Sequence, residues 1–201
     1  MAILKVNPTR VALLGLKKEL KIAKKGHKLL KDKRDGLVKK FMAVIYEAKT
    51  VRESVEARLG AAFDSYARAS SMTSQAALGA AFLAPNAEID LAVKVNSVMS
   101  VKIPEFSIEK RGNAFAYGLL ETTGDLDNAI VKFDDVFVDI LRLAELEKTA
   151  ENLAEEIEKT RRRVSALENV RITNLEDTIK FITMQLDERA RDAVVSTMRV
   201  K

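Results

Sequence analysis

The side chains that most often carry acid–base chemistry are few in this chain and poorly placed for it. There is one histidine, His27, and carboxylate pairs such as Asp134-Asp135 and Glu155-Glu156 are neighbours in sequence. General acid–base catalysis needs groups that converge on one point, whereas adjacent helical residues point about 100° apart. These pairs therefore indicate a solvated helix face and not an active site.

Other catalytic and ligand-binding motifs are also missing from the sequence. Cysteine is absent, which excludes a disulfide framework, a thiol nucleophile and a cysteine zinc site. A phosphate-binding loop needs a Gly-Lys pair after a strand, and no such dipeptide occurs. We therefore predict a protein that is not an enzyme, with no catalytic, cofactor-binding or metal-binding residues and no cofactor.

The elements that remain are long amphipathic helices. Thirteen positions keep an unbroken spacing of three and four residues, which places one seam along a helix that a second helix must cover. They are Leu13, Leu16, Leu20, Ala23, His27, Leu30, Arg34, Leu37, Phe41, Val44, Ala48, Val51 and Val55, continued by Leu59, Ala62, Tyr66 and Ala69. The two polar members, His27 and Arg34, are expected to fix the register of the helix pair at some cost in stability. A pH-sensing role for His27 is the alternative.

The sequence divides into two helices and a middle segment. Asn7 as the cap and Pro8 at the first helical position predict a helix over residues 7–75. A second helix is expected over 123–198, with Thr122 or Thr123 at its start and a phase shift of its seam near Val170. We predict a mainly α fold, a long antiparallel two-helix coiled coil forming a single elongated domain over 1–201.

The middle segment, residues 76–122, contains a predicted β-hairpin. Alternating apolar residues over about 88–103 give a strand period, with Asn96-Ser97 as the turn and Pro104 as the end. Residues 106–121 are expected to be irregular or partly helical. A lone hairpin is marginal in water, so the prediction includes a packing partner for it.

Charge is distributed unevenly along the chain. Residues 1–40 carry a net charge of +10, residues 121–158 carry −9, and the whole chain carries +5. The basic end lacks interleaved aromatic residues for base stacking, so nucleic acid is not expected as a partner. The run Arg161-Arg162-Arg163 is either a solvated face or a contact with an acidic partner.

Helical glycines have two interpretations. Gly15, Gly26, Gly36 and Gly60 lie within the predicted first helix and Gly79 at its fraying end, and each mid-helix glycine costs on the order of 1 kcal/mol relative to alanine. They are either tolerated in a well-packed coiled coil or allow close approach of another protein chain.

With no secretory signal and no uncharged stretch suited to a bilayer, we expect a soluble cytoplasmic protein without membrane insertion.

Two stretches resemble the D subunit of the V-type (archaeal/bacterial A/V-type) rotary ATPases. The first contains Asn7-Pro8-Thr9-Arg10 and residues 25–35; the second contains residues 161–168, Thr178-Ile179-Lys180-Phe181-Ile182 and Leu186-Asp187-Glu188-Arg189. The resemblance covers nearly the whole chain. It departs from the family pattern at Ser165, Thr173 and Ala190, where asparagine, proline and glutamate are usual.

The resemblance implies a central-stalk rotor subunit that transmits torque between ATP hydrolysis or synthesis and ion translocation. Its implied partners are the A and B subunits of the catalytic hexamer, the F subunit and the protein that caps the membrane ring. The implied location is the cytoplasmic face of the cell membrane, as a peripheral part of the complex. The coupling ion, proton or sodium, is not encoded in this chain.

Three alternatives accompany this interpretation. A non-rotary coiled-coil scaffold or tether has the same periodicity. A γ-like rotor of the F-type ATPases also pairs terminal helices, but the segment between them is here too short for an α/β domain. An enzyme in its own right is the least favoured class.

Overall fold

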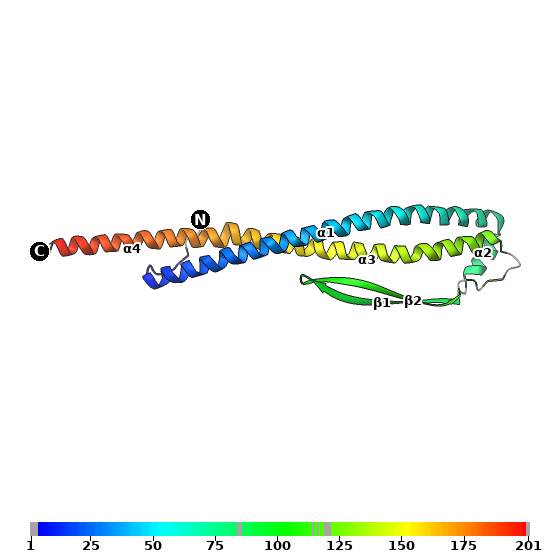
Figure 1. Cartoon of the computed structure of the whole chain (residues 1–201), viewed down its shortest axis with the longest axis horizontal. Helices are drawn as coiled ribbons and strands as arrows, with labels where there is room; N and C mark the ends of the chain where they lie inside the picture. Colours follow the sequence, from blue (N-terminus) through cyan, green and yellow to red (C-terminus); the bar gives the residue numbers. More distant parts are fainter. Residues whose placement is uncertain (1–3, 84–85, 114, 116, 119–121, 200–201) are drawn as a thin grey trace. The chain divides into compact units, whose positions relative to one another are not determined.

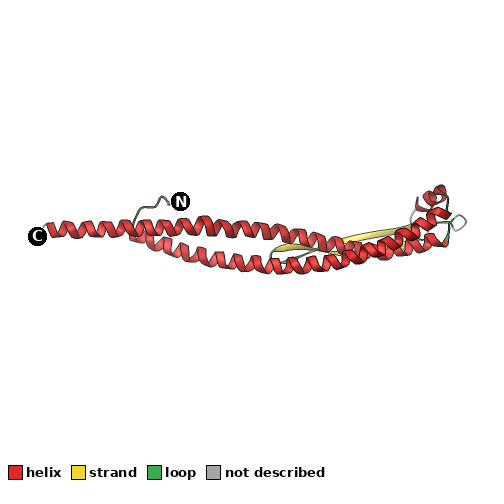
Figure 2. Cartoon of the chain, turned by 90° about the horizontal axis from the view of Figure 1, so that it is seen from above, coloured by secondary structure: helices red, strands yellow, loops and turns green. Residues whose placement is uncertain are grey.

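The computed structural model describes residues 4–83, 86–113, 115, 117–118 and 122–199, and these form helices and one hairpin (Figure 1). The elements are α1 (Arg10–Met72), α2 (Gln75–Phe82), β1 (Asn86–Val98), β2 (Val101–Asn113), α3 (Gly124–Ala166), a π-helical segment (Leu167–Ile172) and α4 (Thr173–Arg199). Figure 2 shows the two strands as the single sheet of the described chain. The predicted mainly α fold with a central hairpin is confirmed.

The chain divides into two compact units. The terminal unit comprises Met1–Val38 and Glu156–Lys201, and the central unit comprises Lys39–Glu155. In each unit α1 runs antiparallel to the C-terminal helices, because contacts that advance along α1 recede along α3 and α4. In the terminal unit, buried Leu16 packs with Leu175 and Ile182. In the central unit, Ala69 packs with Leu126. The prediction of one elongated domain stays a prediction.

The predicted seam of α1 is confirmed in most of its length. All thirteen positions from Leu13 to Val55 are buried or half-buried, and Leu37 is fully buried. Tyr66 was wrongly placed in the seam: it is exposed, and Ser65 is buried in its place. Burial of Ser65 is tolerated because its hydroxyl donates to Ala61 O and accepts from Lys132 Nζ at 2.7 Å.

Both ends of the first helix differ from the prediction. Thr9, and not Asn7, caps α1, since its Oγ1 accepts from the N–H of Ala12 at 3.2 Å. After Met72 the helix does not simply fray. Ser74 caps a further helix, α2, by accepting from the N–H of Ala77. The sequence contained this serine cap, but the small residues around Gly79 were interpreted as the fraying end of α1.

The hairpin is longer than predicted and turns elsewhere. The turn lies at Met99-Ser100, both with positive φ (53° and 70°), and not at Asn96-Ser97. Pro104 lies inside β2 and does not end it, and residues 106–113 are strand and not irregular. The pairing of β1 with β2 explains why the turn lies at Met99-Ser100. It sets Leu91 opposite Ile108 and Val93 opposite Phe106, so one face is apolar and the other charged.

The second long helix begins at Gly124, close to the predicted start, with Asp125 and Asp127 in its first turn. The predicted phase shift near Val170 is present as the π-helical segment Leu167–Ile172. A π-segment inserts one extra residue into a helical turn, so the apolar seam changes phase there. The apolar residues Leu153, Leu175 and Ile182 lie on both sides of the segment and are all buried, which places them in the seam of the second helix.

Candidate interaction surfaces

The described residues contain no cluster suited to a metal ion. No three or more of their His, Asp or Glu side chains lie together so that they could hold one. The carboxylates considered in the sequence make ion pairs: Asp134 binds Lys110, and Glu156 binds Lys33 at 2.9 Å. No described helix is long and apolar enough to cross a membrane.

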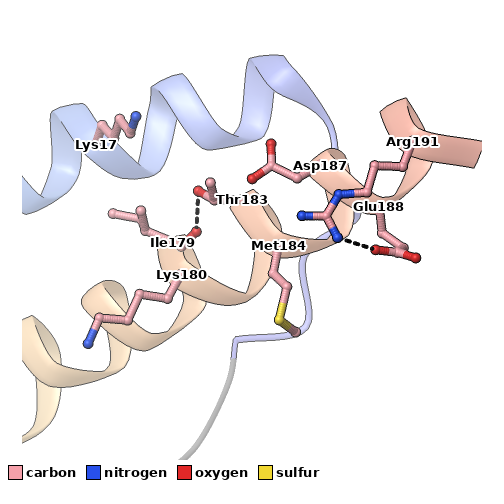
Figure 3. A pocket seen from close by; sticks show the side chains of 8 residues that line it. All are labelled: Lys17, Ile179, Lys180, Thr183, Met184, Asp187, Glu188 and Arg191. Carbon is pink, nitrogen blue, oxygen red and sulfur yellow. Dashed lines mark hydrogen bonds and ion pairs between the residues drawn. The ribbon is translucent and has the colours of Figure 1, made fainter. Parts of the chain in front are cut away.

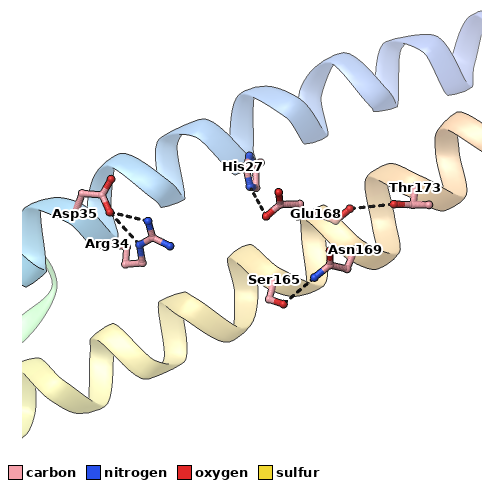
Figure 4. Close-up of polar contacts among 7 residues, drawn as sticks. All are labelled: His27, Arg34, Asp35, Ser165, Glu168, Asn169 and Thr173. Atoms are coloured by element: carbon pink, nitrogen blue, oxygen red, sulfur yellow. Dashed lines mark hydrogen bonds and ion pairs between the residues drawn. The ribbon is translucent and has the colours of Figure 1, made fainter.

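The two polar seam residues lie beside the C-terminal helices of the terminal unit (Figure 4). His27 Nε2 lies 3.5 Å from Glu168 Oε2, without hydrogen-bond geometry, so this buried nitrogen lacks a hydrogen-bond partner among the described residues. Arg34 pairs with its neighbour Asp35 at 2.8 Å. The arrangement agrees with a register-setting role, since a mismatch of the helices would separate His27 from Glu168.

Two of the three departures from the family pattern lie at the π-helical segment. Ser165 lies two residues before the segment, and its Oγ accepts from Nδ2 of Asn169, inside the segment, at 3.1 Å. Thr173 Oγ1 donates to the carbonyl of Glu168 at 3.1 Å, which is a carbonyl of the segment itself (Figure 4). These side chains therefore supply local hydrogen bonds where the regular helical ladder is interrupted.

A surface groove of about 420 Å³ lies in the terminal unit (Figure 3). Ile179 and Met184 give it an apolar part, and the charged side chains include Lys17, Lys180 and Arg191. Arg191 pairs with Glu188 at 3.4 Å. With both signs of charge and no paired nucleophile and base, the groove suits a protein side chain better than a reacting small molecule.

α1 carries a second apolar stripe that faces away from its seam. Val11, Leu14, Ile22 and Leu29 are 61–81% exposed and lie within about 80° of each other on a helical wheel. Gly15 and Gly26 flank them, and added Cβ atoms there would meet nothing within 4 Å. Lys18 and Lys25 lie in the same sector, between these apolar side chains. This surface was not predicted from the sequence because only the seam positions were considered, although a helical wheel of residues 10–30 shows it.

The arginine run of α3 is solvent-exposed. Arg161 and Arg162 both pair with Glu158, at 3.8 and 2.9 Å, and their side chains are 75% and 78% exposed. Exposed pairs of this kind contribute at most about 1 kcal/mol. A solvated face and a contact with an acidic partner both remain compatible with this geometry.

The central unit contains an apolar groove of about 490 Å³ between the helices and the hairpin. Phe63 of α1 and Phe133 of α3 meet edge to face in its wall, with ring centroids 5.3 Å apart. Phe82 of α2 and Ile89 of β1 complete other walls. The groove therefore separates part of β1 from the helices of the central unit.

A partly buried hydrogen bond joins Tyr117, which follows the hairpin, to Asp127 in the first turn of α3. Tyr117 donates its hydroxyl proton to Asp127, and burial together with this carboxylate raises the pKa of the tyrosine well above its usual range. Tyr117 also packs near Phe115. The phenol is thus held as a neutral donor at the start of α3.

Taken together, the fold and its surfaces define a coiled-coil protein whose exposed apolar and charged faces are suited to protein partners. A family model for the ATP synthase D subunit matches residues 12–201. The V-type ATP synthase D subunit of Clostridioides difficile (strain 630) is 46% identical over 204 residues, covering 100% of this chain and 92% of that protein. The chain belongs to the ATP synthase D-subunit family.

Other relatives support the same assignment. The V-type ATP synthase D subunit of Thermoanaerobacter sp. (strain X514) is 45% identical over 203 residues, covering 100% of this chain and 97% of that protein. The protein of the same name from Fusobacterium nucleatum subsp. nucleatum is 46% identical over 204 residues, with 100% and 97% covered. The family resemblance inferred from the sequence motifs is thereby confirmed.

Proposed function

We propose that this chain is the central rotor shaft of its V-type ATP synthase. It transmits torque between ATP hydrolysis or synthesis in the A–B catalytic hexamer and ion translocation in the membrane. The observation that carries the proposal is the double apolar character of α1: one face is buried in the helix pair, while Val11, Leu14, Ile22 and Leu29 face outward. An exposed apolar stripe of this kind supports contact with a surrounding protein surface.

Charge agrees with this placement. Residues 1–40 carry a net charge of +10. The N-terminal part of α1 is therefore suited to a surrounding surface of the A–B hexamer that carries acidic groups. A pair of unlike helices presents a different face at each angle, so each rotational position biases a different catalytic interface. Under this proposal the chain is non-catalytic and binds no nucleotide, because the A and B subunits perform the chemistry.

The remaining partners follow from the same proposal. The F subunit and the protein that caps the membrane ring bind away from the N-terminal end of α1, and the chain resides peripherally on the cytoplasmic face of the membrane. The hairpin is a regulatory contact or is covered by the F subunit. Deleting residues 86–113 should then leave assembly intact and lower ATP turnover; unchanged turnover in the reconstituted complex would contradict this role.

The test is co-purification of the chain with the A, B and F subunits, followed by native mass spectrometry. The proposal expects one copy of this chain per A–B hexamer, with the F subunit bound. Several copies per hexamer, or no association, would favour a non-rotary coiled-coil scaffold. A variant with Val11, Ile22 and Leu29 changed to serine should lose affinity for the hexamer while still binding the F subunit, because these side chains do not contribute to the helix seam.

A further inference from the structure

The hairpin has two outer edges, and the edge of β2 is closed in its half nearest the turn. The carbonyl of Lys102 accepts from Asn152 Nδ2 at 2.9 Å, and the N–H of Phe106 donates to Glu145 Oε2 at 3.1 Å. Pro104, between them, has no N–H to offer. The side chains of α3 and one proline thus hinder a further strand from pairing with residues 102–106 of β2.

The edge of β1 has no comparable protection. Across a two-residue turn, Val98 and Val101 form the first hydrogen-bonded pair. Every second residue before Val98 therefore bonds to β2, and the alternate residues direct N–H and C=O outward. These are Ala87, Ile89, Leu91, Val93, Val95 and Ser97. No described residue donates to or accepts from their outward groups beyond the ladder.

The same alternate residues carry the apolar face of β1. Ile89, Leu91, Val93 and Val95 are 45%, 46%, 53% and 61% exposed. β1 is thirteen residues long and contains no proline. A long, exposed strand edge without proline or a bulge is an acceptor for another strand, because pairing satisfies its backbone groups and covers its apolar side chains.

The sequence of β1 is complementary to itself. We propose that the free edge of β1 binds β1 of a second copy of this chain, antiparallel, about a dyad at Ala92. This register sets Leu91 opposite the second copy's Val93, and Ile89 opposite its Val95. It also sets Asp90 opposite Lys94 twice, once on each side of the dyad.

Other registers are less favourable. Centring the dyad on Asp90 or on Lys94 opposes identical charges, which is destabilising. Centring it on Val93 leaves both charges without a partner. The register at Ala92 engages all six outward residues of each copy. A shift to Leu91 leaves Ser97 overhanging and pairs Lys94 with Glu88 instead.

This inference does not rest on the rotor proposal, since it uses only the hairpin. The dimer and any partner that covers β1 within the ATPase exclude each other. One strand edge pairs once, so a copy whose β1 is covered within the ATPase cannot form this dimer. The pair is therefore a form of the free chain.

Disulfide trapping tests the dyad directly. The chain has no cysteine, so Ala92→Cys introduces a unique thiol. At the dyad this residue faces its own copy in a non-hydrogen-bonded pair, where Cα atoms lie about 4.5 Å apart, within the disulfide range of about 4.4–6.8 Å. Ser107→Cys is the matched control, because Ser107 is the partner of Ala92 on β2 and is also exposed. We expect the Ala92→Cys chain to cross-link at least about tenfold faster.

Charge exchange tests the register by sedimentation equilibrium of the full chain. Asp90→Lys and Lys94→Asp should each raise the dimer dissociation constant at least about tenfold, because both ion pairs become repulsive. Mixing the two variants should restore dimers, since every opposed pair is then of opposite sign. Lys102→Asp, an equal charge change on β2, should leave the constant unchanged.

Three results would overturn the proposal. The wild-type chain could remain monomeric throughout the micromolar range. The two cysteine variants could cross-link at equal rates. The mixed charge variants could fail to associate although each is folded by circular dichroism.

Discussion

Glu145 of α3 accepts a hydrogen bond from the backbone N–H of Phe106 at 3.1 Å, and this contact fastens the hairpin to the helix pair. The acceptor is a carboxylate, so the bond is stronger than one between neutral groups. The ion pair between Lys110 and Asp134 joins the same two elements about three helical turns away along α3.

Removing this carboxylate should loosen the hairpin without unfolding the helices. In Glu145→Ala the hydrogen bond, worth about 1.5–3 kcal/mol with a charged acceptor, is lost. We expect the amides of β2 to exchange at least about tenfold faster, measured by hydrogen exchange. Glu151→Ala is the control on the same helix, since Glu151 pairs only with Lys148 among the described residues. Equal exchange in both variants would refute the anchoring role.

The seam prediction can be tested with two leucines of one helix. Leu37 is fully buried, whereas Leu29 is 69% exposed. Leu37→Ala should lower the free energy of unfolding by about 2–5 kcal/mol through lost burial and a cavity. Leu29→Ala should change it by less than about 0.5 kcal/mol. Urea denaturation of the isolated chain measures both, and similar losses would show that the stripe around Leu29 is buried in solution.

The helices were predictable because their signal is repeated many times. Thirteen seam positions agree on one face, so single errors such as Tyr66 for Ser65 do not alter the outcome. The hairpin was predicted only in part, because its turn depends on a few residues. Asn96-Ser97 has the better local turn chemistry, yet pairing of Leu91 with Ile108 and Val93 with Phe106 required the turn at Met99-Ser100. The outer stripe of α1 could have been found on a helical wheel, whereas contacts such as Glu145 with Phe106 join elements far apart in sequence and could not be predicted.

Glycine substitutions should separate the two candidate turns. Ser100 has a φ of 70°, which glycine adopts without strain. Ser100→Gly should therefore stabilise the hairpin by up to about 1 kcal/mol. Ser97→Gly, inside β1, should destabilise it by about 0.5–1 kcal/mol. Amide exchange of the hairpin residues reports both changes, and the opposite order would place the turn at Asn96-Ser97.

Two glycines should respond oppositely to alanine. Gly112 has a φ of 89°, and an added Cβ would lie 1.9 Å from the carbonyl oxygen of Asn86. Gly112→Ala should thus disrupt the end of the hairpin. Gly26 is helical with open space around it, so Gly26→Ala should stabilise the isolated chain by about 1 kcal/mol. Thermal unfolding of each variant measures the difference.

The same Gly26→Ala variant distinguishes the two interpretations of the helical glycines. If the backbone of another protein chain approaches α1 closely there, the stabilised variant should assemble less well with the A and B subunits. Unimpaired assembly would mean that Gly26 is merely tolerated. Co-purification with the hexamer proteins, at equal protein concentrations, measures this.

Acid should weaken one ion pair of the terminal unit. Lys24 Nζ lies 2.7 Å from Glu176 Oε1, and its hydrogen bond and charge lower the pKa of that carboxyl. A lowered folded-state pKa stabilises the fold above the ordinary value of about 4.3, and this contribution is lost as the pH falls through the folded-state value. Both side chains are about half exposed, so the effect is small.

Lys24→Met should therefore reduce the loss of stability on acidification, measured as urea midpoints at about pH 6 and about pH 3. Lys25→Met, an exposed neighbour on α1, serves as the control and should follow the parent chain. Identical behaviour of the two variants would show that the pair does not contribute in solution.

Direct observation of rotation tests the rotor proposal most directly. Because the chain has no cysteine, Ser71→Cys, at an exposed position of α1, gives a unique attachment point for a bead. The complex is immobilised through its catalytic hexamer and supplied with ATP. The rotor account predicts unidirectional turning of the bead with three dwell positions per revolution. A bead that stays fixed while the same complexes hydrolyse ATP would contradict it.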